Sequence, residues 1–415
     1  MFSLRTAPWG AVCVLLVASA SASTPPPPAL QAAVREWWAR SPQVEAASAA
    51  LRAAQARATA AAQPVYNPTL QLEGENADVD RRTAGVSLAL DLSGKRRARM
   101  SESDADVRAK AAAYALQRRD VAADGLKAWA GANFAREQSE LGRRRVAVMA
   151  RFDTLAADRL RVGDISTSER DLAALALGEA QIQQASLAQQ EATSLAALEG
   201  LGANLSQPLP ALPRDLPPGT DDLAPMAVAD RPELVQAQAE QDRAEAGVVV
   251  AQRARRPDPT LSFTGGQVRS GPRNDRVTGI SVSMPLPIRD TGRAGVVAAQ
   301  ADADVAFATR RAASLRSEAS LKQAQATYAA LRAATASFRQ SRASAFDERA
   351  HTLEKLWQAG EIGTSDYLVQ LKQSLDTALA AVALESQTWQ AWFDYLAAAG
   401  RLTEWIDGPA KDVSP

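Results

Sequence analysis

Residues 162–169 read VGDISTSE, and 197 residues later positions 359–366 read AGEIGTSD. Other landmarks recur in the same order. PQVE at 42–45 and NPTL at 67–70 return as PELV at 232–235 and DPTL at 258–261, and GVSL at 85–88 with GKR at 94–96 returns as GISV at 279–282 with GR at 292–293. A repeat that carries strand and turn motifs is a duplicated structural unit. We therefore expect two similar units that lie side by side in one assembly.

Two stretches of the chain, 95–161 and 291–358, are rich in alanine and contain no proline. Each would reach about 100 Å as a continuous helix, at 1.5 Å per residue. Shorter helical patterns cover roughly 30–63, 166–201, 231–256 and 364–402. The last of these has the 3-4 spacing of a coiled-coil seam, broken only at Glu385. Because alanine buries little area per residue, we expect these helices to pack against neighbours on both sides.

Between the helices, two segments alternate apolar with small or polar residues, as strands with two different faces do. They predict β-hairpins at about 68–91 and 259–285, each bracketed by prolines that end helices. One face is apolar and comprises Leu70, Leu72, Val86, Leu88, Leu90, Leu261, Phe263, Ile280, Val282 and Met284. The other face is polar and comprises Gln71, Glu73, Ser87, Asp91, Ser262, Ser281 and Ser283.

The predicted organisation has five parts. These are a signal peptide at 1–22, a first repeat at 23–201, a proline-rich connector at 202–230, a second repeat at 231–402 and a tail at 403–415. Arg5, an apolar run at 11–18 and small residues up to Ala22 are typical of a secretory signal peptide cleaved after Ala22. Cys13, the only cysteine, lies in that apolar run, so we expect no disulfide in the exported chain.

Composition argues against several classes of function. After removal of Arg5, 46 basic residues balance 47 acidic ones, which does not favour nucleic-acid binding. His351 is the only histidine and lies among charged residues, so we expect a solvated side chain rather than a metal ligand. The chain shows no nucleotide-binding glycine loop and no nucleophile motif. We expect no catalytic residues, no cofactor and no resident metal.

The hairpins leave two interpretations of the fold open. In a coiled-coil protein dissolved in water, each hairpin would pack onto a helical face. Alternatively, strands about ten residues long with alternating polarity are suited to a transmembrane β-barrel. Two hairpins cannot close a barrel or cover their own edges, so the second interpretation requires several copies of the chain.

The order of helix, hairpin, very long helix, glycine turn and helix, occurring twice, resembles the TolC-type outer-membrane efflux family across the whole exported chain. The specific marks are NPTL at 67–70, GKR at 94–96, the segment from PLPI at 285–288 to GR at 292–293, and the two Gly-x-Ile turns. GKR and PLPI most resemble the cobalt-zinc-cadmium subgroup of that family.

The resemblance implies a mainly α fold with a small β part. Three chains would contribute four transmembrane strands each to one twelve-stranded barrel, and their long antiparallel helices would form a coiled-coil tunnel in the periplasm. It also implies the partners: a homotrimer, outer-membrane lipid, a periplasmic adaptor protein and an inner-membrane pump of the RND type.

In the family, acidic residues near the turns at the helical end form the tunnel entrance. Asp366 matches one of them, Glu169 is its counterpart in the first copy, and Asp164 and Glu361 lie nearby. The second family aspartate falls at Val369, so a complete acidic ring is in question. Helix capping and the helix dipole are an alternative explanation for these acids. The resemblance also places adaptor docking at these turns, and the candidate residues are Gly163, Ile165, Gly360 and Ile362.

The sequence thus predicts an outer-membrane exit duct of a tripartite efflux system, which exports metal cations or drugs and opens at its periplasmic end. Two alternatives stay open at this point. One is the outlet of a type I protein-secretion system, and the other is a periplasmic coiled-coil adaptor or scaffold without a channel.

Overall fold

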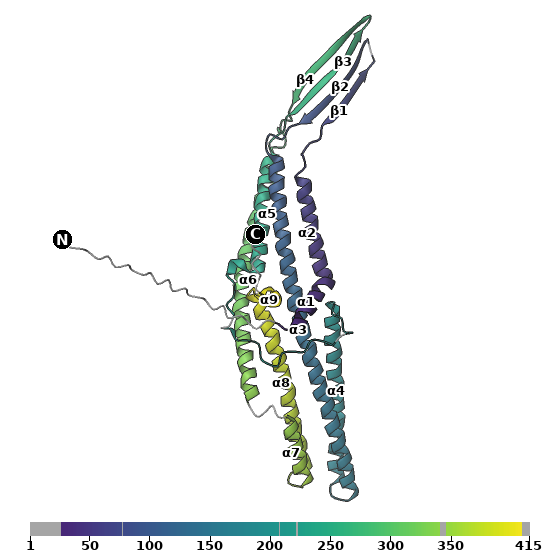
Figure 1. Ribbon diagram of the computed structural model, residues 1–415, viewed down its shortest axis with the longest axis vertical. Helices are drawn as coiled ribbons and strands as arrows, with labels where there is room; N and C mark the ends of the chain where they lie inside the picture. Colours follow the sequence, from purple (N-terminus) through teal and green to yellow (C-terminus); the bar gives the residue numbers. More distant parts are fainter. Residues whose placement is uncertain (1–25, 77, 207, 221–222, 341–345, 409–415) are drawn as a thin grey trace, which may run out of the picture.

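The computed structural model describes residues 26–76, 78–206, 208–220, 223–340 and 346–408. The predicted signal peptide at 1–22 lies outside this part of the chain. The molecule is elongated, with a four-stranded sheet at one end and helices that run from it to a far end with two turns (Figure 1). For convenience, the end with the two turns is called the tip.

Each repeat supplies one hairpin and the helices on either side of it (Figure 1). The first comprises α1 (Pro28–Arg40), α2 (Pro42–Ala61), β1 (Thr69–Glu75), β2 (Val79–Ala89), α3 (Lys95–Arg161) and α4 (Thr167–Gly200). The second comprises the short η2 (Val228–Asp230), α5 (Pro232–Ala254), β3 (Thr260–Ser270), β4 (Arg273–Ser283), α6 (Arg293–Gln340), α7 (Phe346–Gln358) and α8 (Thr364–Ala398).

The predicted helical segments agree with the structure except at a few boundaries. The segment 30–63 contains two helices, because Pro42 has no N–H to continue α1 and instead begins α2, which Ser41 caps. α6 and α7 occupy the predicted helix at 291–358 on either side of 341–345, and those five residues lie outside the described part of the chain. The predicted tail contains most of a further helix, α9 (Leu402–Asp407), which follows the turn at Gly400.

The four strands form one antiparallel sheet in the order β1-β2-β3-β4. Its register aligns Leu70, Val86, Phe263 and Ile280 in one row and Thr69, Ser87, Ser262 and Ser281 in the next. Successive rows lie on opposite faces. Ser87 is only 6 % exposed whereas its neighbour Val86 is 49 % exposed, although no helix covers either face. For convenience, the face with the small residues is called concave and the face with the large apolar residues convex.

The helices follow the same lateral order as the strands. Next to the sheet, α2 packs on α3, α3 on α5, and α5 on α6. Farther from the sheet, α4 replaces α2, and α8 replaces α5. The protomer is thus a layer with one edge formed by β1, α2 and α4 and the other by β4 and α6.

Two clusters of large side chains hold this layer together. The first lies about midway along the molecule and includes Trp37, Trp129, Trp392 and Phe393, which come from α1, α3 and α8. The second lies near the tip and is built around Phe152, Trp357 and Tyr367. Glu385, which interrupts the seam of α8, lies near the first cluster and forms a two-pronged ion pair with Arg339 of α6, at 2.7 and 2.9 Å. The polar residue in the seam thus joins two helices.

The connector between the repeats crosses the helices at the level of the first cluster. Its backbone carbonyl groups accept hydrogen bonds from side chains of three helices. Trp129 of α3 donates to Pro210, Tyr328 of α6 to Pro218, and Tyr395 of α8 to Leu223, at 2.6 to 2.9 Å. Because its prolines supply no N–H, the connector has few donors for its own carbonyls, and the helices provide donors instead. The connector, residues 202–230, is therefore attached to the helices by side-chain donors and is called the belt.

No helix within the described residues has both the length and the apolar character needed to cross a membrane.

Candidate functional site

The two turns at the tip have the same backbone geometry. Gly163 and Gly360 have φ angles of 79° and 75°, and they follow the last turns of α3 and α7. In both copies the next residue donates its N–H back to the helix, from Asp164 to Arg159 at 2.9 Å and from Glu361 to Leu356 at 3.0 Å. This is the helix ending that glycine favours because it has no Cβ. A Cβ built on either glycine would meet no atom within 4 Å, so the outer side of each turn is open.

The acidic residues that follow these turns differ between the copies. In the first, Glu169 accepts hydrogen bonds from the backbone N–H and the hydroxyl of Ser166, both at 2.9 Å, and Ser166 in return accepts from the N–H of Glu169. This capping box lowers the pKa of Glu169 through the hydrogen bonds from Ser166. In the second copy the residue that caps α8 is Gly363, which has no side chain. Asp366 is exposed, and within the described residues its carboxylate has no partner.

Arg159 connects the two copies at the tip. Arg159 of α3 donates hydrogen bonds to the backbone carbonyls of Trp357 at 3.4 Å and Gln358 at 2.9 Å, at the end of α7. Its guanidinium lies 4.4 Å from the centre of the Trp357 ring and 3.5 Å from the carboxylate of Asp164. A cation at a helix C-terminus is favoured by the helix dipole. Arg159 therefore fastens the α3–α4 pair to the α7–α8 pair.

An aromatic core lies beneath this contact. Phe152 packs 4.6 Å from Trp357 and 4.7 Å from Tyr367, measured between ring centres. Burial raises the pKa of Tyr367 to about 12, so its hydroxyl stays neutral at physiological pH. Ile165 and Ile362, which the sequence suggested for adaptor docking, are partly buried against this core. The surface that the turns leave open is formed by the glycine backbone, Asp164 and Glu361.

The strand residues predicted for the two faces separate as the register requires. Leu70, Leu72, Val86, Leu88, Leu261, Phe263, Ile280 and Val282 share the convex face, and Gln71, Glu73, Ser87, Ser262, Ser281 and Ser283 share the concave face. Three residues lie just beyond the strand ends: Leu90, Asp91 and Met284. Asp91 does not belong to the concave face, because it caps α3 by accepting hydrogen bonds from the N–H groups of Lys95 and Arg96, both at 2.8 Å. These bonds offset burial and lower the pKa of Asp91.

A buried ionic network joins the sheet to the helices. Asp258, at the start of the second hairpin, is paired with Lys95 at 2.9 Å and accepts hydrogen bonds from the hydroxyls of Tyr66 at 2.6 Å and Ser93 at 3.3 Å. Burial opposes the charge of Lys95, but the bond and the charge of Asp258 outweigh burial and raise the pKa of Lys95. Asp258 comes from the second copy and its three partners from the first. The sequence shows Asp258 only as the counterpart of Asn67 and does not reveal these partners.

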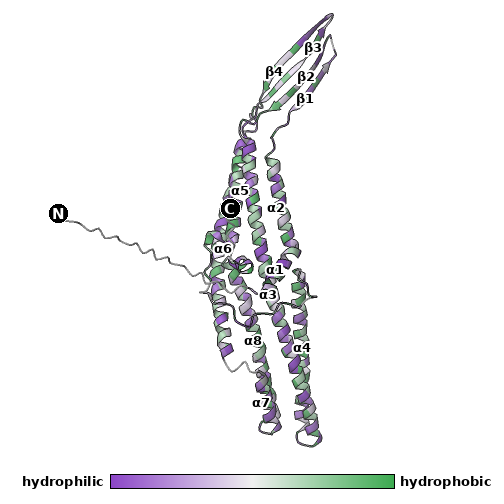
Figure 2. Ribbon diagram, in the orientation of Figure 1, coloured by the Kyte–Doolittle hydropathy of each residue, from purple (hydrophilic) through white to green (hydrophobic). Residues whose placement is uncertain are grey.

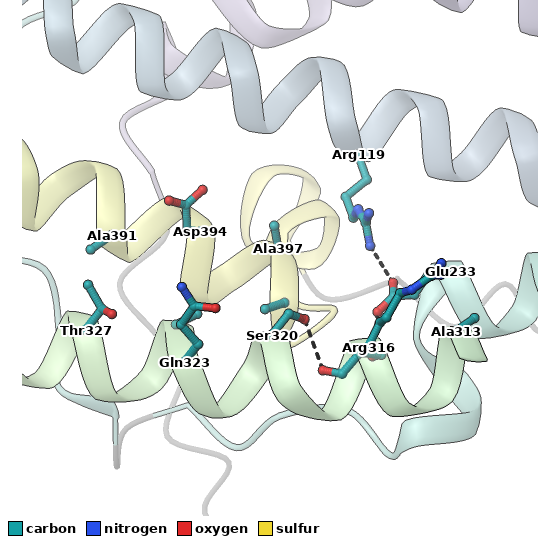
Figure 3. A pocket seen from close by; sticks show the side chains of 13 residues that line it. Arg119, Glu233, Ala313, Arg316, Ser320, Gln323, Thr327, Ala391, Asp394 and Ala397 are labelled. Carbon is teal, nitrogen blue, oxygen red and sulfur yellow. Dashed lines mark hydrogen bonds and ion pairs between the residues drawn. The ribbon is translucent and has the colours of Figure 1, made fainter. Parts of the chain in front are cut away.

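A pocket of about 610 Å³ lies where α8 ends and α5 begins, between α3 and α6 (Figure 3). Its charged groups are engaged with one another: Glu233 of α5 is paired with Arg119 of α3 and also accepts a hydrogen bond from Ser317 of α6 at 2.7 Å. Arg231 in turn donates to Ser317 at 2.9 Å. The pocket is therefore a contact region between helices, in which Glu233 links Arg119 of α3 to Ser317 of α6.

Solved structures with the same architecture are outer-membrane channels. The CmeC outer membrane channel of Campylobacter jejuni superposes with a TM-score of 0.73 and 16 % identity, over 90 % of this chain and 86 % of that one. The open state of the MtrE outer membrane channel of Neisseria gonorrhoeae gives 0.71 and 18 %, over 90 % and 89 %. This chain has the outer-membrane channel fold. A membrane protein from Pseudomonas aeruginosa matches with a TM-score of 0.75 and 18 % identity, over 91 % of this chain and 94 % of that one.

Sequence comparison agrees with the structural match. The cobalt-zinc-cadmium resistance protein CzcC of Cupriavidus metallidurans is 24 % identical over 339 residues, which cover 80 % of each chain. No family model matches the sequence. The resemblance to the TolC-type channels is confirmed for the fold, and the relative belongs to the subgroup that GKR at 94–96 and PLPI at 285–288 suggested.

Proposed function

We propose that three copies of this chain form a passive exit duct through the outer membrane, as part of a tripartite efflux system. An inner-membrane pump of the RND type supplies the energy, and a periplasmic adaptor docks on the turns at Gly163 and Gly360. The chain itself carries out no catalysis. The name of the relative CzcC favours metal cations as cargo over drugs.

The observation that carries this proposal is the four-stranded sheet with one apolar face and two uncovered edges. β1 and β4 are the outer strands, and each presents unpaired backbone groups along one side. A strand edge of this kind must pair with another strand, and in a membrane it must do so completely. Three copies related by rotation would pair β4 of one with β1 of the next and close twelve strands, with the apolar convex face toward lipid.

The helical edges are compatible with the same arrangement. α4 exposes Leu172, Leu175 and Ile182, and α6 exposes Val297, Val305, Phe307 and Leu315. These apolar side chains lie on the two lateral edges of the protomer, where neighbours in a ring would cover them. The helices would then enclose a tunnel that continues the barrel.

Three measurements test the proposal. The assembled protein should behave as a trimer in detergent by light scattering and should remain with the outer membrane when peripheral proteins are extracted with urea. Deletion of the gene should lower tolerance to divalent metal cations, and re-expression should restore it. A monomer that urea releases from membranes would contradict the duct, whereas unchanged metal tolerance in the deletion strain would remove only the proposed cargo.

The difference between Asp366 and Glu169 leads to a prediction about selectivity. If Asp366 faces the tunnel entrance, three copies form a ring of carboxylates that favours cations. Val369 lies one turn farther along α8 and is exposed, so no second ring of carboxylates lies at that level. Asp366→Asn should therefore lower the cation-to-anion permeability ratio several-fold, measured from the reversal potential in a salt gradient across a planar bilayer.

Glu169→Gln is the matched control, because glutamine preserves the capping box with Ser166 and removes a charge already held by that box. It should change the permeability ratio little. Equal effects of the two substitutions would show that Asp366 has no special position at the entrance.

A further inference from the structure

The two ends of the sheet differ in charge. At the junction with the helices, segments 90–99, 253–259 and 284–293 contain nine basic residues and three acidic ones, an excess of six positive charges. At the opposite end, segments 73–82 and 267–276 contain five of each and are balanced. In Figure 2 hydrophilic residues gather where the helices meet the sheet. A membrane-spanning sheet flanked in this way has one strongly cationic rim.

Several of these cations are free to bind a ligand. Arg97, Arg256, Arg289 and Arg293 are all exposed, and their guanidinium groups have no hydrogen-bond or ion-pair partner within the described residues. Lys95, in contrast, is held by Asp258 at 2.9 Å and belongs to the fold. The exposed arginines are therefore not needed to satisfy buried carboxylates.

The positions of two of these arginines are unfavourable for helix stability. Arg97 lies in the first turn of α3, Arg293 begins α6, and neither first turn contains an acidic residue. The positive end of a helix dipole disfavours cations at such positions. In both copies, arginine in the first turn of a helix lowers the stability of that helix. This indicates that these cations take part in an interaction outside the fold.

Exposed apolar side chains lie between the strand ends and these cations. Leu92 is 74 % exposed, Leu286 is 68 % and Ile288 is 79 %. In both copies the chain thus passes from the apolar strand face through exposed leucine or isoleucine to arginine. A pocket of about 600 Å³ opens at the same level, and its lining includes Arg255, Arg256 and Leu286. Apolar groups followed by cations match the order of acyl chains and phosphates at the surface of a bilayer.

We infer that this cationic rim binds the phosphate groups of anionic phospholipids in the leaflet that faces the helices. The inference rests on the proposed function, because it requires the sheet to span a membrane. The exposed guanidinium groups supply paired donors that suit phosphate oxygens, and Leu286 and Ile288 contact the acyl chains. Each arginine near an anionic membrane surface strengthens binding of the protein to that surface about fivefold. Several arginines together therefore favour an anionic lipid over a zwitterionic one.

The test is a lipid titration of the full-length exported protein in detergent, with bound lipids counted by native mass spectrometry. Phosphatidylglycerol should bind at least about tenfold more tightly than phosphatidylcholine, from the cations acting together. The variant R97Q/R256Q/R289Q/R293Q should lose this preference. The matched control R81Q/R82Q/R269Q/R276Q removes four exposed arginines at the balanced end of the sheet and should retain it.

Three results would overturn the inference. They are equal binding of the two lipids by the unmodified protein, loss of the preference in the control variant but not in the rim variant, and displacement of phosphatidylglycerol by glycerol 3-phosphate at equal concentration. The last would indicate a site for free phosphate. Should the rim variant fail to fold, the comparison of the two lipids on the unmodified protein decides alone. If the protein forms channels in planar bilayers but binds the two lipids equally, only this inference is refuted. If the protein never inserts into bilayers, the proposed function is refuted.

Discussion

Replacing Arg159 with alanine is expected to raise the resting conductance of the proposed trimer about tenfold or more. The substitution removes two hydrogen bonds to the end of α7 and the contact with the Trp357 ring. Hydrogen bonds from a charged group contribute about 1.5–3 kcal/mol and a cation–π contact about 0.5–1 kcal/mol. Since about 1.4 kcal/mol changes an equilibrium tenfold, losing these contacts in each protomer should strongly favour separation of the two helix pairs at the tip.

The measurement is single-channel conductance of purified protein in planar bilayers at low voltage. Under the proposed function, the unmodified channel should pass little current without its partners, because Arg159 keeps the two helix pairs together at the tip. Arg161→Ala is the matched control. Arg161 lies two positions after Arg159 on the same helix, its side chain is 75 % exposed, and it pairs only with Asp158 within the described residues. A high conductance of the unmodified protein, or identical traces for the two variants, would show that Arg159 does not hold the entrance.

Asp258→Ala is expected to cause the largest loss of stability, about 1.5–3 kcal/mol, as for the loss of a hydrogen-bonded charged group. Removing one partner of a buried ion pair leaves the other charge without compensation, and the Asp258 side chain is only 3 % exposed. Lys95, whose side chain is 19 % exposed, would then carry a partly buried charge without its partner, and Tyr66 and Ser93 would lose their acceptor. Thermal unfolding followed by circular dichroism in detergent should show a markedly lower midpoint.

A second substitution separates the charge effect from a cavity effect. Lys95→Met in the Asp258→Ala background removes the orphaned charge and should restore part of the lost stability. Asp275→Ala is the control at the far end of the sheet, where the ion pair with Arg273 is exposed and contributes at most about 1 kcal/mol. If Asp258→Ala unfolded at the temperature of that control, the network would not be a structural joint.

The same network has a predictable response to alkaline pH. The pKa of Lys95 is raised in the folded protein, so its contribution to stability is fully present below the ordinary lysine pKa of about 10.4. That contribution is lost as the pH rises through the higher folded value. Stability conferred by Lys95 is therefore complete throughout the physiological range.

Much of the fold is predictable from the sequence because glycine and proline mark its boundaries. α3 occupies Lys95–Arg161 as expected, since Gly94 precedes it and Gly163 ends the turn that follows it. The strand faces are predictable from the strict alternation of apolar and polar residues, because a shift of one residue would reverse the faces. Asp91 was misassigned because alternation continues past the strand, where the side chain turns to cap α3 instead.

The site was less predictable because it depends on contacts between the copies. Arg159 lies 198 residues from Trp357, and no local pattern connects them. The distinction between Glu169 and Asp366 depends on Ser166 being replaced by Gly363, a change that matters only once both are recognised as helix caps. Ile165 and Ile362 suggested a docking surface from their position, but the aromatic core beneath the turns accommodates both.

The belt at mid-height has a consequence for how such chains diverge over evolutionary time. The connector is held through its carbonyl oxygens, which every amino acid supplies, whereas Trp129, Tyr328 and Tyr395 are particular donors on the helices. Mutations can therefore accumulate along the connector with little penalty while the donors are kept. An alignment of distant homologues would therefore match poorly along the connector, although the carbonyls of Pro210, Pro218 and Leu223 are held by the helices.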